Sequence, residues 1–455
     1  AAAEAAGAAE FVLFTGDFPW HSMQRMPQPA ETVRGVVRNV SAAIRAAFPG
    51  TPAAFGPLGN NDNPQNYYQA VTTPQAEHPW FSAVGQEMRM ASVMNCDEWS
   101  DFKYGSYYET NHGNLTILSI ATVYYSVGHV PESPKESDPF RQFSWLRERL
   151  QAAADAGTKV WIVGHIPPGI ETYGSTALWR PEYVEAYLAI VQDPVLGSCI
   201  AAQLFGHVHK DEFRYLPKIP AGAGPMLLTA SISPVYYNWP TFKLVEYDPE
   251  TKRLLNYRAF YVSELPRGPA QPPQWKFGYD LLQTYPQLPE GGLLMADFKA
   301  LTHKMQAGLR DYDWYAKWYT MQYPNTYQKY ATTANNSALN QTSRAIGRHN
   351  FLCAARVTTY SQYVDCTAAK QGARGRASTR SALRDIFHDF PYAEIGEENT
   401  LAIGRLLHWA AQSTGAPLSH DILGSARACA ARGDWRPFLA TYSRYLRYGS
   451  ALPGE

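Results

Sequence analysis

The sequence of 455 residues has neither a long apolar stretch nor an excess of charge of one sign. No apolar run reaches the roughly 20 residues that a transmembrane helix needs, so we expect no membrane-spanning segment. Lys and Arg together number 40, as do Asp and Glu, so the formal net charge is zero. That balance argues against a nucleic-acid-binding protein and against electrostatic attachment to an anionic membrane.

The sequence also lacks a recognisable signal peptide, an internal repeat and an initiating Met. It opens with the Ala-rich segment AAAEAAGAAE, which resembles an internal segment more than a natural start. We therefore interpret the chain as a fragment or a processed product of a longer protein.

Cysteine is scarce, and the count is odd, which leaves at least one thiol without an internal partner. The five cysteines are Cys96, Cys199, Cys353, Cys366 and Cys429. Cys353 and Cys366 lie close together in sequence, and we predict that they form a disulfide, with buried free thiols as the alternative. Glycosylation sequons occur at Asn39, Asn114, Asn335 and Asn340, a pattern that is weak evidence alone because it arises often by chance.

Two changes of pattern divide the chain into three parts. Residues 1–262 alternate apolar runs with helical patterns, which is typical of an α/β domain. A segment rich in Pro and Gly follows at 263–273, and we place a domain boundary there. Residues 263–370, which begin with this segment and turn helical after it, are expected to form a helical C-terminal subdomain. Residues 371–455 are expected to form a helical extension, to which no chemistry can be assigned. Within the first part, the spacing predicts helices at 144–156 and 181–191 and strands at 226–229, 242–247 and 253–262.

Aromatic residues are concentrated between residues 312 and 330. They are Tyr312, Trp314, Tyr315, Trp318, Tyr319, Tyr323, Tyr327 and Tyr330. Such rings suit a lipid-facing surface at a membrane interface. The same helical spacing also suits the packed core of a helical subdomain, and we favour that interpretation.

Four short blocks combine a Gly with residues that commonly bind metals. They are Gly16 with Asp17, Gly59 with Asn60, Asn61 and Asp62, Gly164 with His165, and Gly206 with His207, Val208 and His209. Three of the blocks follow short apolar runs, at 11–14, 160–163 and 201–205, which predict buried strands. A Gly directly after a strand permits a tight turn that presents the next side chain at the strand's end.

Carboxylate, amide and imidazole groups gathered in this way can hold divalent metals. Asp17 is the natural carboxylate to bridge two ions, a device that promotes phosphate-ester hydrolysis by making hydroxide at neutral pH. His207 and His209 cannot both point the same way from an extended strand, but at a turn they can reach different sides of a site. Each residue alone also has a structural interpretation, such as a turn residue or a satisfied buried histidine. The order of the four blocks favours a metal site.

The order of the blocks resembles the calcineurin-like metallophosphoesterase superfamily, whose pattern runs D-x-H, G-D, G-N-H-[DE], G-H and G-H-x-H. The segments GHIPPG at 164–169 and FGHVHKDEF at 205–213 resemble most closely acid sphingomyelinase and the acid sphingomyelinase-like phosphodiesterases. Pro19 and His21 after Asp17 match that group too. The resemblance covers about residues 10–370. It implies a four-layer α/β/β/α sandwich with a helical C-terminal subdomain, here without its first strand.

Carried over by position, the resemblance implies two divalent ions, zinc in this group, bridged by Asp17. Asn60, His165 and His207 would bind one ion, and His209 would bind the other. His21 matches a histidine near the leaving group, which implies general acid catalysis. A structural histidine beside Trp20 is the alternative. Trp20 itself occupies the place where purple acid phosphatases carry a tyrosine ligand, which argues against an iron-tyrosinate site.

Two departures from the family pattern bear on activity. The D-x-H block is absent, so we expect one metal to lack two of its ligands in this chain. The His of G-N-H-[DE], which contacts the phosphate, is replaced by Asn61. An Asn there can donate a hydrogen bond but can carry neither a proton nor a positive charge. Some endopolyphosphatase-like members carry the same G-N-N-D sequence.

The sequence therefore predicts a metal-dependent phosphoric ester hydrolase, resembling sphingomyelin phosphodiesterases, in which a metal-bound hydroxide attacks phosphorus in line. Its expected partner is a lipid or small-molecule substrate with a phosphodiester or phosphoanhydride, and peripheral contact with a membrane surface stays open. A nucleotide or polyphosphate hydrolase of the same fold is one alternative, and a catalytically inactive glycoprotein scaffold is another. The resemblance and the sequons together favour a secreted or lysosome-like location.

Overall fold

The computed structural model of the chain describes residues 9–71, 77–89, 95–130, 136–172, 175–236, 238–265, 273–307, 309–323, 349 and 351–369. These residues belong to one compact unit, Ala1–Gly372. The expected helical extension at 371–455 and the sequons at Asn335 and Asn340 lie outside the described residues.

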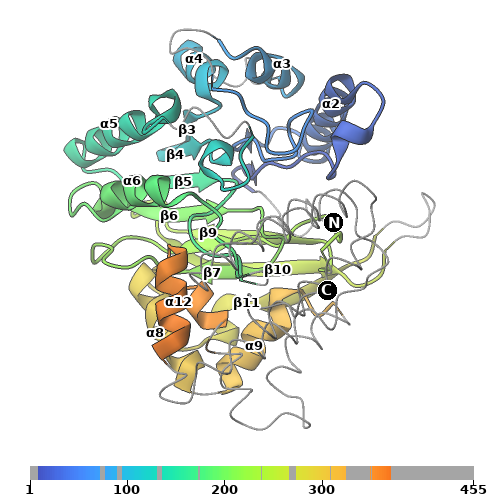
Figure 1. Ribbon diagram of the computed structural model, residues 1–455. Helices are drawn as coiled ribbons and strands as arrows, with labels where there is room; N and C mark the ends of the chain where they lie inside the picture. The colour runs from blue at the N-terminus through green and yellow to red at the C-terminus, as the bar shows by residue number, and fades with distance from the viewer. Residues whose placement is uncertain are drawn as a thin grey trace, which may run out of the picture. The chain divides into compact units, whose positions relative to one another are not determined.

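A six-stranded mixed sheet forms the centre of this unit (Figure 1). Its strands, in spatial order, are β3 (Tyr108–His112), β4 (Leu115–Ile120), β5 (Val160–Gly164), β6 (Ile200–Phe205), β8 (Met226–Leu228) and β7 (Glu212–Arg214). Strands β4, β5, β6 and β8 run parallel, while β3 and β7 pair antiparallel at the two edges. Strand β5 is buried along its whole length, as expected for a strand that is covered on both faces.

Two smaller sheets accompany the central one. An antiparallel sheet contains β11 (Trp275–Asp280), β10 (Leu254–Val262) and β9 (Thr241–Tyr247), in that spatial order. A short parallel pair joins β1 (Val12–Phe14) to β2 (Ala53–Phe55), with Leu13 opposite Ala54. This pair brings two of the four blocks, which follow β1 and β2, to the same edge.

Helices lie on both sides of the two larger sheets (Figure 1). They are α2 (Pro29–Ala47), α3 (Pro79–Glu87), α4 (Cys96–Gly105), α5 (Gln142–Asp155), α6 (Pro181–Val191), α7 (Leu281–Thr284), α8 (Met295–Ala307), α9 (Leu309–Tyr319) and α12 (Tyr360–Ala369). Short 3₁₀ helices are η1 (Met23–Arg25), η3 (Val123–Tyr125), η4 (Pro139–Arg141) and η5 (Gly197–Cys199).

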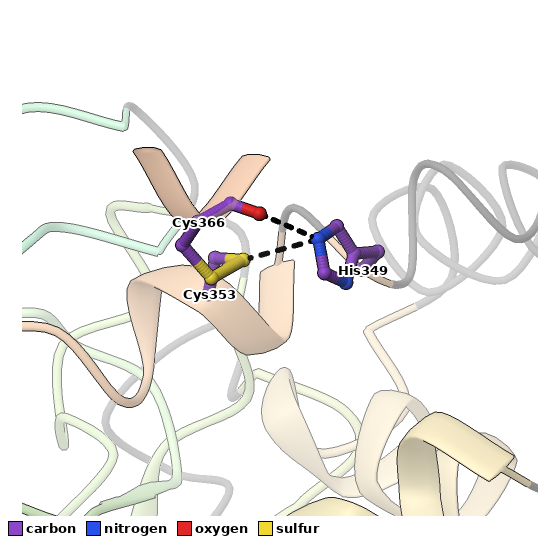
Figure 2. A group of neighbouring side chains, drawn as sticks. All are labelled: His349, Cys353 and Cys366. Carbon is purple, nitrogen blue, oxygen red and sulfur yellow. Dashed lines mark hydrogen bonds between the residues drawn. A yellow bond between two sulfur atoms is a disulfide. The ribbon is translucent and has the colours of Figure 1, made fainter. Parts of the chain in front are cut away.

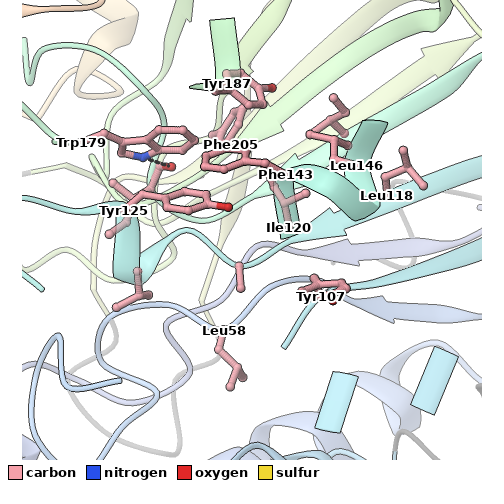
Figure 3. Close-up of a cluster of buried hydrophobic side chains, with 14 of the residues drawn as sticks. Leu58, Tyr107, Leu118, Ile120, Tyr125, Phe143, Leu146, Trp179, Tyr187 and Phe205 are labelled. Atoms are coloured by element: carbon pink, nitrogen blue, oxygen red, sulfur yellow. Dashed lines mark hydrogen bonds between the residues drawn. The ribbon is translucent and has the colours of Figure 1, made fainter. Parts of the chain in front are cut away.

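Two hydrophobic clusters define the order of the layers. Alternate residues of β4 and β5 point to opposite faces, so Leu118 and Ile162 enter one cluster while Trp161 enters the other. The first cluster joins the central sheet to α5 and α6, through residues such as Phe143, Leu146, Trp179 and Tyr187 (Figure 3). The second joins the same sheet to β10 and to helices α8 and α9. The order helix, sheet, sheet, helix confirms the expected α/β/β/α fold.

The elements expected from the hydrophobic pattern mostly agree with the structure. Helix α6 has the expected bounds, and helix α5 ends just before Gly157, whose φ of 65° terminates it. The expected strands at 226–229, 242–247 and 253–262 are β8, β9 and β10. The expectation of helical structure throughout the region after residue 273 was wrong for β11, because its edge position leaves a mixed burial pattern rather than a clear alternation.

Four aromatic residues of helix α9 pack inside the protein. Tyr312, Tyr315, Trp318 and Tyr319 are all buried and belong to the second hydrophobic cluster. The favoured interpretation, a packed core, is therefore correct for these four rings, and they are unavailable to a lipid surface. Tyr327 and Tyr330 lie outside the described residues. No helix in the described part of the chain is both long and apolar enough to cross a membrane.

The predicted disulfide between Cys353 and Cys366 is present (Figure 2). It ties helix α12 to the turn of helix that carries Cys353. His349 Nε2 lies 2.7 Å from the Cys366 carbonyl oxygen and 3.5 Å from Cys353 Sγ. Cys199 is a buried free thiol and Cys96 an exposed one.

A buried ion pair links the two larger sheets. Lys243 on β9 donates to Asp211 at 2.7 Å, and the two side chains are 4% and 3% exposed. The Tyr279 hydroxyl donates to the other Asp211 oxygen at 3.0 Å, and Lys243 also donates to the Leu228 carbonyl. Because Asp211 follows His209 by two residues, this network anchors the segment that carries the fourth block.

Replacing Lys243 with Met should destabilise the fold by about 3 kcal/mol, because it leaves the Asp211 carboxylate buried without its cation. The measurement is the free energy of unfolding by urea denaturation. Arg258→Met is the matched control in the same sheet. Arg258 pairs with Glu246 at 3.2 Å, but both side chains are more than two-fifths exposed, at 43% and 48%. Its loss should therefore cost less than about 1 kcal/mol. Equal losses for the two variants would contradict this interpretation.

Candidate metal centre

The apolar runs before three of the blocks are strands, and their ends converge. Asp17 follows β1, His165 follows β5 and His207 follows β6. One ligand atom from each of these residues lies within 4.8 Å of those of the other two. His165 Nε2 is 3.3 Å from Asp17 Oδ2 and 3.3 Å from His207 Nδ1. The structure thus gathers a carboxylate and two imidazoles from three distant segments of the chain.

Asn60 completes this first group. Its Oδ1 lies 3.1 Å from His165 Nε2, and its Nδ2 donates to Asn66 Oδ1 at 2.8 Å, which fixes the amide orientation. His165 Nδ1 lies 2.7 Å from the Thr15 carbonyl oxygen, which can only accept. That contact places one ring proton on Nδ1, so Nε2, which faces Asp17, Asn60 and His207, is the nitrogen that could coordinate an ion once it is deprotonated.

A second group shares Asp17 with the first. Asp17, His21 and His209 each offer a ligand atom, and these atoms also lie within 4.8 Å of one another. The ring centroids of His21 and His209 are 5.6 Å apart, and the Tyr236 ring packs against both, at 5.0 and 4.8 Å. His21 therefore lies near enough to be a ligand, in addition to the leaving-group role expected of it.

The backbone at these turns lies in the left-handed region. The φ angles of Asp17, His207 and His209 are 61°, 67° and 62°. For residues other than Gly this conformation costs about 1 to 2 kcal/mol each and is concentrated at functional sites. The turn separates the two histidines as the sequence predicted, since His207 enters the first group and His209 the second.

Burial keeps the two turn histidines neutral. Burial, followed by the charge of His165, holds the pKa of His207 well below its usual range. Burial also lowers the pKa of His209 to about 3. Burial alone would raise the pKa of Asp17, but the adjacent His165 lowers it below its ordinary value. A carboxylate and neutral imidazoles are the protonation states that bind metals.

The residues of both groups fit divalent ions. His209 Nδ1 is a buried atom without a hydrogen-bond partner among the residues that the structure describes. Such an orphaned lone pair is costly unless something outside the protein satisfies it. Together with His165 Nε2, which points into the first group, this nitrogen supports two adjoining ion sites that share Asp17.

A third group of potential ligands does not fit a metal. His349, Cys353 and Cys366 also lie close together, but the two sulfurs are bonded to each other (Figure 2). A disulfide has no thiolate to offer, and thiolates are the form in which cysteines bind metals.

Asn61 lies beside Asp17 rather than apart from it. Its backbone N–H donates to Asp17 Oδ1 and its Nδ2 donates to Asp17 Oδ2, both at 2.8 Å. Its Oδ1 is buried, with no partner within the described part of the chain. The side chain thus orients Asp17 and leaves one acceptor unused.

Three residues near the groups were not predicted from sequence. The Tyr67 hydroxyl lies 3.3 Å from His207 Nε2, Tyr236 packs on His21 and His209, and Asp62 accepts hydrogen bonds from the Asp17 turn. Asp62 belongs to the block that begins at Gly59, so the sequence pattern could have indicated that it lies near the site. The two tyrosines lie in loops with no motif, and only the fold brings them to the site.

Comparison with known proteins gives relatives but no family match. The chain matches no protein-family model. It is 30% identical over 287 residues to sphingomyelinase phosphodiesterase D of Dictyostelium discoideum. That alignment covers 61% of this chain and 61% of the relative. The chain is 28% identical over 296 residues to acid sphingomyelinase-like phosphodiesterase 3b of Homo sapiens, covering 61% and 62%. It is also 28% identical over 292 residues to cyclic GMP-AMP phosphodiesterase SMPDL3A of Homo sapiens, covering 61% and 61%.

These relatives confirm the resemblance that the motifs predicted, and the chain spans about 61% of the length of the relatives it matches. Among solved structures, a dimetal phosphatase of Danio rerio shares 11% identity, with 56% of this chain and 93% of that chain covered. Its TM-score of 0.30 is too low to support a conclusion.

Proposed function

We propose that this chain carries the catalytic centre of a metal-dependent phosphoric diester hydrolase. The observation that carries the proposal is the shared position of Asp17 in two groups of ligands at the ends of adjoining strands. Three relatives named as phosphodiesterases support the same reaction class.

The proposed ligands follow the two groups. Asp17 would contribute to both ion sites, while Asn60, His165 and His207 would hold one ion and His209 would hold the other. Ligand sets rich in imidazole suit zinc, which is the metal we propose. The chemistry that two such ions supply is a nucleophile at neutral pH and neutralisation of the charge on the phosphoryl oxygens.

The other residues act on orientation and proton transfer. Asn61 holds both Asp17 oxygens in place through its backbone and side-chain N–H groups. His21, at the half-exposed side of the second group, would give a proton to the departing alkoxide. Its proximity to Asp17 and His209 favours a second role as a metal ligand. The two roles predict different metal contents and different turnover when His21 is replaced.

The proposed substrate is a phosphodiester that carries an apolar group, such as a choline-headgroup lipid. Three exposed apolar side chains, Trp20, Ile232 and Val235, which we call the apolar rim, are 70%, 60% and 43% exposed. Trp20 precedes His21, and the other two lie shortly before Tyr236 in the sequence, whose ring packs on His21 and His209. Exposed apolar residues beside a reaction centre favour a lipid substrate and peripheral contact with its membrane.

A nucleotide phosphodiester is the second candidate. One relative is named as a cyclic GMP-AMP phosphodiesterase, and its 28% identity to this chain equals that of the human acid sphingomyelinase-like phosphodiesterase 3b. An inactive scaffold is the third, motivated by Asn61. We further propose a secreted or lysosome-like location, supported by the disulfide, which persists in oxidising compartments. Asn39 and Asn114 are exposed, as glycosylation would require.

The proposal is tested by elemental analysis of metal content and by turnover of bis-p-nitrophenyl phosphate by this chain, with and without a chelator. Two ions and chelator-sensitive turnover support the enzyme. Absence of both metal and turnover favours the scaffold. Choline-headgroup vesicles, a cyclic dinucleotide and polyphosphate then distinguish the substrates.

His21→Ala separates the two roles of His21. As a general acid, His21 should matter for an alkoxide leaving group, with a loss of roughly 10²-fold to 10⁴-fold in kcat. It should matter little for p-nitrophenolate, which needs no proton to depart, and the metal content should stay at two. A fall in metal content would instead identify His21 as a ligand. His303→Ala, an exposed histidine on α8, is the control and should change neither quantity.

A further inference from the structure

Asp62 is a fully buried carboxylate that joins two of the four blocks. Its side chain is 0% exposed. Oδ2 accepts from the backbone N–H of Asp17 at 2.8 Å and of Gly59 at 2.6 Å, and Oδ1 accepts from the backbone N–H of Phe18 at 2.8 Å. Two of the three donors thus come from the turn that carries the proposed bridging ligand, 44 and 45 residues away in sequence.

These hydrogen bonds stabilise an otherwise unfavourable backbone. Asp17 has a φ of 61°, which is unfavourable for a residue with a side chain. The hydrogen bonds that the Asp17 and Phe18 N–H groups donate to Asp62 offset that cost, because hydrogen bonds to a carboxylate are among the stronger ones in proteins. Burial and the nearby Asp17 charge raise the pKa of Asp62 to about 7, while the three N–H donors favour the ionised carboxylate.

The same short segment controls both ends of Asp17. Asp62 holds its backbone, and the adjacent Asn61 holds both oxygens of its carboxylate. The segment is itself anchored, because Trp80 Nε1 donates to the Asp62 carbonyl at 2.8 Å. The direction of the Asp17 carboxylate is thus set from one side of the site by Asp62 and Asn61, whose described hydrogen bonds to the two ligand groups go to Asp17.

We propose that Asp62 is a positioning residue for the metal centre, which fixes the left-handed turn that aims Asp17 at both ligand groups. This inference rests on the proposed function, since it assumes that Asp17 binds metal. Asp62 touches neither His165, His207 nor His209 through any described hydrogen bond. It acts on metal binding only through Asp17 and the backbone beside it.

A purely structural role is the competing explanation, and the chain offers a matched control for it. Asp138 also accepts three hydrogen bonds, from the backbone N–H groups of Phe143 and Ser144 and from the Ser144 hydroxyl. These donors lie in the first turn of α5, and none of the hydrogen bonds described for Asp138 reaches a residue of either ligand group. Asp138→Asn therefore reports what the loss of a similar carboxylate does to the fold alone.

The test measures Zn²⁺ affinity by calorimetry and the visible spectrum of bound Co²⁺ on the full chain, at a temperature well below the Tm of every variant. In Asp62→Asn, the new NH₂ must face either the Phe18 N–H or the two N–H groups at Oδ2, so at least one bond is lost. Zn²⁺ affinity should fall roughly 10-fold to 100-fold, as when other supporting residues of metal sites are removed, and the Co²⁺ spectrum should shift. Asp138→Asn should lower Tm and leave both metal readouts unchanged.

Wild-type Zn²⁺ affinity in Asp62→Asn, or an equal loss in Asp138→Asn, would overturn the inference. If Asp62→Asn does not fold, Asp62→Glu retains the charge but displaces the acceptors by one methylene, and it should still weaken Zn²⁺ binding. Asp17→Asn distinguishes a wrong role for Asp62 from a wrong proposed function. If it abolishes Zn²⁺ binding while Asp62→Asn does not, only the role of Asp62 is wrong. If Asp17→Asn also binds normally, the proposed function fails.

Discussion

Asp17→Asn is expected to lower kcat/KM by roughly 10⁴-fold, the largest effect of any single substitution in this chain, because one carboxylate serves both ligand groups. Asparagine has nearly the same shape, but it is neutral and offers one oxygen in place of two. It cannot bridge two ions with a charged group on each side. The loss of negative charge also leaves His165, His207 and His209 facing a cation without a carboxylate to offset it.

Metal content decides whether that loss of activity has the proposed cause. Asp17→Asn should bind at most one ion per chain by elemental analysis. Its Tm without metal should fall, since the new NH₂ group cannot accept from Asn61 and the charge that faces His165 is lost, so the metal content is measured well below that Tm. Asp155→Asn, at the exposed end of α5, is the control and should change neither metal content nor turnover. Two bound ions with a lost activity would mean that Asp17 acts other than as a bridge.

The convergence of the blocks could be predicted from sequence because each is a local pattern. An apolar run, a Gly and a ligand-type residue together predict a strand end, and β1, β5 and β6 end as expected. The carboxyl ends of neighbouring parallel strands meet at one edge of a sheet, so local patterns were sufficient to bring His165 and His207 together at the ends of β5 and β6. Asp17 follows β1, which belongs to the separate pair with β2, and its approach to the two histidines depends on how the fold places that pair. The separation of His207 from His209 followed from the same geometry.

The supporting contacts could not be predicted, since they depend on loops of distant sequence position. Tyr236 reaches His21 across more than two hundred residues, and no periodicity marks it. Strand β11 was missed because an edge strand need not alternate cleanly. Asn61 occupies the place of the motif's phosphate-contacting His, and the sequence indicated only that it could still donate a hydrogen bond. Its hydrogen bonds to Asp17 depend on how closely two turns approach, which a motif does not record.

That close approach is itself testable at Gly59. A Cβ at this position would lie 2.1 Å from Asp17 Oδ1 and 2.6 Å from the Asp17 backbone nitrogen. Both distances are far inside van der Waals contact, so Gly59→Ala must push the Asp17 turn away from the segment that holds it. A displacement of about 1 Å in a catalytic group can cost about 10²-fold in rate, and here the displaced group serves two ion sites. We therefore expect a loss of roughly 10³-fold in kcat/KM and weaker Zn²⁺ binding.

Gly35→Ala is the matched control, because a Cβ there meets no atom within 4 Å. Gly35 lies inside helix α2, where Ala is favoured over Gly by about 0.5 to 1 kcal/mol, so this variant should be slightly more stable and fully active. Gly59→Ala with normal Zn²⁺ affinity would show that Asp17 tolerates displacement. The close packing of the two turns would then serve stability alone. A loss of metal affinity confined to Gly59→Ala would instead establish that the distance between the turns sets the geometry of the metal centre.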